Sequence, residues 1–172
     1  MIGMPFNGYH ETMTTASYSA VLDHPLTTVW SLIRDFNNYP AYIEGVSESV
    51  IEDDRRGDEV GAIRRFCYLG HWIRQRLVAH SDLSHSLTYA GLEPLQFPAE
   101  LASQPVSPAQ YEGTMSLREI TQGNRTLIEW SVTIEAEPEH ADRWHALFRS
   151  WIPDWTRSLE TTLARSVRDA RF

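Results

Sequence analysis

The chain contains no lysine, and all 15 of its basic residues are arginines. A mechanism that needs a Schiff-base or general-base lysine is therefore excluded. Cys67 is the single cysteine, so no disulfide can form within the chain. No apolar run approaches the roughly 20 residues that span a membrane, and the N-terminal residues lack the apolar segment of a secretory signal peptide. We therefore expect a cytoplasmic protein without stable membrane insertion.

Several other chemical signatures are also missing. The net charge of −8 and the lack of a basic stripe argue against a nucleic-acid partner. His140 and His145 are five residues apart, which does not place them on one helix face as metal ligands. Gly57 and Gly61 fit no phosphate-loop pattern, and no G-x-S-x-G nucleophile motif occurs. The sequence therefore predicts no metal site and no cofactor.

Alternating apolar and polar residues predict an antiparallel sheet. The expected strands are 16–23, 46–52, 61–69, 72–80, 86–92, 111–120 and 126–135. Two short helices should follow the first strand, one starting near Pro25 and one over 40–44. Residues 139–167 predict one long helix whose apolar stripe is Trp144, Leu147, Phe148, Trp151, Trp155, Leu159 and Leu163. This order indicates an α+β fold in which a curved seven-stranded antiparallel sheet wraps around the long C-terminal helix.

Two segments show no periodicity. Residues 1–14 are expected to form a flexible N-terminal arm, which leaves 15–172 as a single domain. Residues 93–109 contain four prolines, which cannot donate to a strand ladder. An irregular stretch of this length inside a compact domain is usually a functional loop or a lid. We predict that it is the most mobile ordered segment.

The order of elements and four local stretches resemble a known family. These stretches are LDHPLTTVWSLIRDFNNYPAYIEGV, GDEVGAIRRF, IRQRLVAHSDLSHSLTYAGLE and TLIEWSVTIEAEP. Together they resemble the START-like superfamily, also called SRPBCC, over roughly residues 16–167. Its members include polyketide cyclases, dehydrases and lipid-transport proteins. The resemblance implies a bacterial-type START-like domain with the helix-grip fold and a cavity between sheet and helix.

Strand parity predicts which side chains face that cavity, because alternate residues of a strand point to the same side. The expected ligand-binding residues are Arg64, Phe66, Tyr68, Gln75, Tyr89, Tyr111, Met115, Trp130, Phe148, Trp151 and Trp155. In the strand over 72–80, the alternation also directs Ile73, Leu77 and Ala79 inward. Arg65 and Cys67 fall on the outer face of the strand over 61–69.

Arg64 and Gln75 are the polar members of this otherwise apolar set. A buried arginine needs a partner or a ligand anion, and Glu44 is the nearest candidate in the sequence. Arg64 either lies hydrated and salt-bridged near the cavity mouth, or it holds a ligand carboxylate or enolate through its bidentate fork. In members of the family that this chain resembles, the junction before the second strand, where Glu44 lies here, often places a polar side chain in the pocket.

Three functions are compatible with these features. The leading one is binding of a small hydrophobic or aromatic ligand, such as a lipid or a polyketide, by a monomer or homodimer. The second is a polyketide cyclase, aromatase or dehydratase, for which Arg64, Tyr89, Tyr111 and Glu44 are the candidate catalytic groups. The third is a structural or interaction domain with a filled interior. The sequence does not decide whether any reaction is catalysed.

Overall fold

The computed structural model describes residues 11–169, with side chains as far as Ser166. Its strands are β1 (Thr12–Leu22), β2 (Val46–Ile51), β3 (Ile63–Tyr68), β4 (His71–Ser81), β5 (Ser86–Gly91), β6 (Gln110–Ile120) and β7 (Arg125–Ala136). Its helices are α1 (Leu26–Ile33), α2 (Tyr39–Tyr42), the 3-10 turn η1 (Ala99–Leu101) and α3 (Ala141–Asp169). All strands pair antiparallel in the order β1-β7-β6-β5-β4-β3-β2. The predicted α+β helix-grip fold is confirmed.

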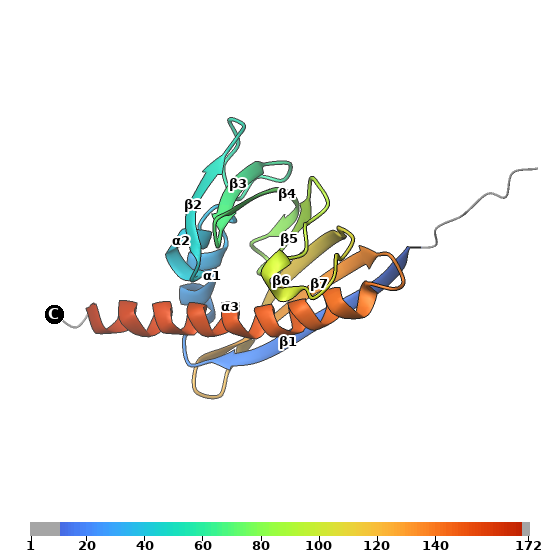
Figure 1. Cartoon of the computed structure of the whole chain (residues 1–172). Helices are drawn as coiled ribbons and strands as arrows, with labels where there is room; N and C mark the ends of the chain where they lie inside the picture. Colours follow the sequence, from blue (N-terminus) through green and yellow to red (C-terminus); the bar gives the residue numbers. More distant parts are fainter. Residues whose placement is uncertain (1–10, 170–172) are drawn as a thin grey trace, which may run out of the picture.

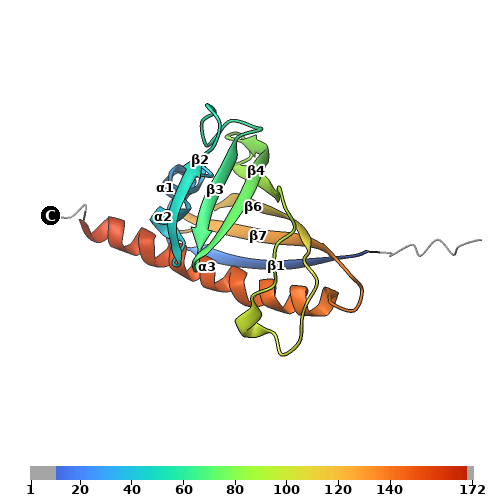
Figure 2. The same cartoon turned by 45° about the horizontal axis from the view of Figure 1, so that its top comes forward.

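The sheet curves around α3. Figures 1 and 2 show α1 and α2 beside the C-terminal half of this helix, and the loop between β5 and β6 beside its N-terminal half. The main core therefore lies between the inner face of the sheet and the apolar face of α3. Within residues 11–169, no helix combines the length and the apolar character needed to cross a membrane.

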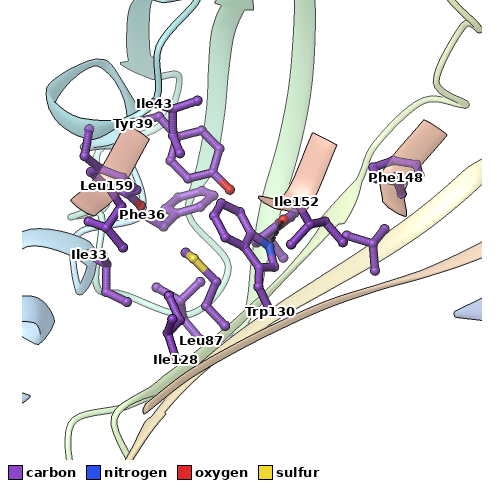
Figure 3. Close-up of a cluster of buried hydrophobic side chains, with 14 of the residues drawn as sticks. Ile33, Phe36, Tyr39, Ile43, Leu87, Ile128, Trp130, Phe148, Ile152 and Leu159 are labelled. Atoms are coloured by element: carbon purple, nitrogen blue, oxygen red, sulfur yellow. Dashed lines mark hydrogen bonds between the residues drawn. The ribbon is translucent and has the colours of Figure 1, made fainter. Parts of the chain in front are cut away.

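The predicted apolar stripe of α3 faces the sheet. Trp144, Phe148 and Leu159 are buried, and Ile152, which the stripe omitted, is also fully buried. Figure 3 shows Ile152 next to Trp130 of β7, with Phe148 and Leu159 on opposite sides of this pair in the same core cluster. A helix that buries one continuous apolar face against a sheet gains most of its stability from that packing rather than from intrinsic helix propensity.

A tight turn between β3 and β4 sets the register on which the site depends. Leu69 and Gly70 have φ values of 49° and 85°, as the two central residues of a type I′ hairpin turn require. This turn pairs Tyr68 with His71, and the antiparallel count then places Arg64 directly opposite Gln75. Both side chains point into the core.

Two sequence expectations about the strands are wrong. Strand β1 begins at Thr12, so Thr12–Thr14 belong to the sheet and not to an N-terminal arm, while residues 1–10 of that arm lie outside the described residues. Ala79 was expected to face inward but is exposed. The register of β4 against β5 shifts between Leu77 and Ala79, and a bulge of this kind reverses the parity beyond it.

The segment over residues 93–109 forms no strand, as its prolines predicted, but it is tied to α3. The Ser107 N–H donates to His140 Nδ1 at 3.0 Å, and its hydroxyl donates to Glu137 at 2.8 Å. Its carbonyl oxygen accepts a hydrogen bond from Trp144 Nε1 at 2.9 Å. All three polar groups of Ser107 are thus bound at the N-terminal end of α3. Greater mobility elsewhere in the segment stays a prediction.

The packing of α3 can be tested with two leucines of very different exposure. Leu159 is 0% exposed and Leu83 is 92% exposed. Leu159→Ala should lower the free energy of unfolding by about 2–5 kcal/mol, since it leaves a cavity between helix and sheet. Leu83→Ala should change it by no more than about 0.5 kcal/mol. Denaturant unfolding measures both, and equal small losses would contradict the packing described here.

Candidate functional site

A cavity of about 40 Å³ lies between the sheet and α3. Nine of the predicted ligand-binding residues line it: Phe66, Tyr68, Gln75, Tyr89, Tyr111, Trp130, Phe148, Trp151 and Trp155. Ile73, which strand alternation directed inward, lines it too, and sequence reasoning missed four further lining residues, which are Tyr39, Ile43, Val46 and Leu95. Most of these come from α2, the start of β2 and the loop after β5, where strand parity gives no direction. The lining is aromatic and aliphatic apart from the Gln75 amide and the tyrosine hydroxyls.

Three predicted site residues, Met115, Glu44 and Arg64, do not line the cavity. Met115 is fully buried in the core and does not line the cavity. Glu44 is exposed and borders a separate surface groove, with its backbone N–H donating to Ser158 Oγ at 2.8 Å. The expectation that Glu44 partners Arg64 is therefore wrong, because the turn after α2 directs this side chain away from the core.

Arg64 lies behind the cavity wall and is 0% exposed. Its Cζ atom sits 3.6 Å from the ring centroid of Tyr39, 4.4 Å from that of Phe36 and 4.9 Å from that of Phe66. Aromatic faces attract a guanidinium, and the attraction is stronger away from water. Arg64 therefore does not lie at the mouth of the cavity, which overturns the first expectation for this residue.

The partner of the Arg64 guanidinium is the Gln75 amide. Arg64 Nε and Nη2 donate to Gln75 Oε1 at 3.1 and 2.5 Å, whereas Nη1 has no hydrogen-bond partner among the described residues. Gln75 Nε2 in turn donates to the Tyr111 hydroxyl at 2.8 Å. Polar groups thus connect the buried charge to the cavity. By contrast, Arg65 is exposed, as predicted, and stacks on Trp72.

The tyrosines of the inner wall are held neutral. Burial raises the pKa of Tyr111 and raises that of Tyr89 well above its usual value. The Tyr89 hydroxyl accepts a hydrogen bond from Trp130 Nε1 at 3.0 Å. No carboxylate or imidazole lines the cavity within the described part of the chain. The inner wall therefore offers hydrogen-bond donors and acceptors but no ordinary general base.

Two glycines make room for these tyrosines. A Cβ atom at Gly91 would lie 2.5 Å from the Tyr111 ring, and one at Gly113 would overlap the Tyr89 ring. The tyrosine rings therefore fill the space that the two glycines leave over the neighbouring strands.

The mouth of the cavity is closed by half-buried side chains. Tyr68, Ile73, Leu95 and Trp151 line the cavity and also line a surface groove of about 680 Å³. This groove runs between the β3–β4 turn and the loop over 93–101. Only side chains therefore separate the cavity from the groove.

The sequence profile described as polyketide cyclase / dehydrase and lipid transport matches residues 13–170. The chain belongs to this family. The match covers nearly all of the described residues, so both the cavity and the groove lie within the family's domain. No curated protein matches the chain.

Several solved structures share the fold of this chain. An uncharacterized protein from Bacillus thuringiensis is 22% identical, with a TM-score of 0.70 over 88% of this chain and 99% of that one. The protein XoxI from Bacillus cereus is 23% identical, with a TM-score of 0.70 over 88% and 96% of the two chains. A protein from Nitrosospira multiformis is 24% identical, with a TM-score of 0.63 over 85% and 96%. At these identities the likeness establishes the fold alone.

The fit between Gly113 and Tyr89 generates a stability prediction. Gly113→Ala should lower the free energy of unfolding by about 1–3 kcal/mol, because the added methyl group displaces the Tyr89 ring. In a protein that already carries Tyr89→Leu, Gly113→Ala should lower the free energy of unfolding clearly less. Denaturant unfolding of the wild type, the two single variants and the double variant measures this difference. An equal loss of unfolding free energy with and without Tyr89 would show that its ring is not the reason for glycine at position 113.

Proposed function

We propose that this protein binds a small, mainly hydrophobic or aromatic molecule between the sheet and α3. The observation that carries the proposal is the cavity itself, with aromatic walls and a few hydrogen-bonding groups at its inner end. Apolar walls with a small number of placed polar groups are typical of small-molecule sites. Membership of a family described by polyketide chemistry and lipid transport supports the same function.

Binding requires the mouth to open. A cavity of about 40 Å³ has room for a few water molecules, whereas sites for drug-sized ligands measure roughly 300–1,000 Å³. A ligand must therefore displace side chains and extend toward the groove. The inner wall is a poor candidate for this movement, because Tyr39, Phe66 and Tyr89 also pack around Arg64.

We infer that Trp151 is the side chain that moves. It is half-buried and lines both the cavity and the groove. Trp144 and Trp155 of the same helix donate indole hydrogen bonds to Ser107 and Tyr68, at 2.9 and 3.0 Å. Within the described residues, Trp151 makes no side-chain hydrogen bond, and its indole packs against the rings of Tyr68, Phe148 and Trp155. Rotation of its indole would join the cavity to the groove.

The cyclase alternative finds no specific support in the cavity. An aldol step needs a group that removes a proton, and burial keeps Tyr89 and Tyr111 protonated. Glu44, the carboxylate among our candidates, lies outside the cavity. Binding without assigned chemistry is therefore the function that the site supports best.

Titration with N-phenyl-1-naphthylamine, a neutral probe that fluoresces in apolar surroundings, tests the proposal. The wild-type protein should bind it, and Trp151→Ala should raise the association rate roughly tenfold, because binding that waits for a conformational change is slowed. Trp72→Ala is the matched control, since Trp72 lines the groove but not the cavity. Absence of binding would contradict the proposal. Binding weakened by Trp72→Ala and unaffected by Trp151→Ala would indicate a groove site instead.

A further inference from the structure

Arg64 fixes the direction of a hydrogen-bond chain that leads into the cavity. An arginine side chain can only donate hydrogen bonds. Because Nε and Nη2 of Arg64 both point at one terminal atom of Gln75, at 3.1 and 2.5 Å, that atom must be the amide oxygen. The amide nitrogen of Gln75 must then point the other way. The orientation of this amide is thus set by the buried charge.

The next bond in the chain is directional for the same reason. Gln75 Nε2 lies 2.8 Å from the Tyr111 hydroxyl, and an amide nitrogen donates but does not accept. The Tyr111 oxygen is therefore the acceptor, and its own proton must point away from Gln75. Within residues 11–166 no side-chain or backbone acceptor receives that proton. Tyr111 lines the cavity and burial keeps it protonated, so an unsatisfied O–H donor faces the binding space.

The other cavity tyrosines differ in this respect. Tyr89 and Tyr68 also accept hydrogen bonds, from the indoles of Trp130 and Trp155. However, the Tyr89 hydroxyl lies beside that of Tyr39, which can receive its proton. Tyr68 is half-buried at the mouth, where solvent is available. Among the described residues, Tyr111 is the one cavity tyrosine whose hydrogen bonds lead back, through Gln75, to a buried charged group.

We propose that the Tyr111 hydroxyl donates a hydrogen bond to an acceptor oxygen of the ligand, and that Arg64 is a positioning residue that acts through Gln75. This inference rests on the proposed ligand-binding function and narrows the ligand class. The ligand is a hydrophobic molecule that carries a carbonyl or similar acceptor oxygen where it meets Tyr111. Hydrogen bonds in a chain strengthen one another when each group donates to the next, and a charged donor at the start of the chain adds to this effect. A ligand with a donor at this point would meet a second donor and leave both unsatisfied.

Three tricyclic probes of nearly the same shape test this inference. Fluorenone carries a carbonyl acceptor, fluorene carries neither donor nor acceptor, and carbazole carries an N–H donor. By equilibrium dialysis, the wild-type protein should bind fluorenone about fivefold more tightly than fluorene, the effect of one neutral hydrogen bond. Carbazole should bind no more tightly than fluorene. Tyr111→Phe should remove the difference between fluorenone and fluorene.

Gln75→Glu tests the role of the chain's direction, because it keeps the size of the side chain. A carboxylate accepts hydrogen bonds from both Arg64 and Tyr111, so the Tyr111 proton would turn away from the cavity. The Tyr111 oxygen would then be free to accept, and carbazole should bind more tightly than fluorenone. A merely structural role for Gln75 would change the affinities of the three probes equally. Such a result would overturn the positioning role of Arg64.

The outcomes separate this inference from the proposed function. Measurable but equal binding of fluorenone and fluorene by the wild-type protein would overturn the inference and leave the binding function intact. If none of the three probes binds, the proposed function is contradicted and the inference falls with it. If the Tyr111→Phe protein also binds fluorenone more tightly than fluorene, by the same factor as the wild type, the donor is another residue. That result would overturn the inference.

Discussion

A buried guanidinium that finds no carboxylate partner among residues 11–166 constrains the interior of this protein. Leaving an uncompensated charge in a low-dielectric core costs several kcal/mol, and at Arg64 this cost is offset by the Gln75 amide and by aromatic faces. Tyr39, Phe66 and Tyr89 belong both to the surroundings of Arg64 and to the cavity wall. A change that enlarged the inner end of the cavity would therefore uncover the charge. This part of the wall must stay in place.

The mouth of the cavity is under no such constraint. Trp151 is half-buried, makes no side-chain hydrogen bond within the described residues, and lines both the cavity and the surface groove. The Ser107 contacts hold one end of the loop over 93–109 against α3, so opening does not require this whole loop to detach. In the binding function that we propose, a fixed inner wall sets the chemistry of the ligand and one movable side chain sets access.

Much of this arrangement can be predicted from the sequence, and the failures have physical causes. Within a regular strand, parity correctly directed Phe66, Arg64 and Gln75 inward. It failed at Ala79, because a bulge leaves no clear mark in the sequence and reverses parity beyond it. The partner of Arg64 could have been predicted from the sequence, since a two-residue turn at Leu69 and Gly70 places Gln75 directly opposite Arg64. The narrowness of the cavity could not be predicted, because it depends on how the rings pack in three dimensions.

The most direct test of this account is a crystal structure of the protein with fluorenone bound. The account predicts the tricyclic ring next to Tyr111, with its carbonyl oxygen in hydrogen-bond range of the phenol. The Trp151 indole should be rotated toward the groove, while Arg64 and the aromatic rings around it keep their positions. Fluorenone seated only in the outer groove, with Trp151 unmoved, would contradict the account. So would a complex in which the rings around Arg64 separate to admit the ligand.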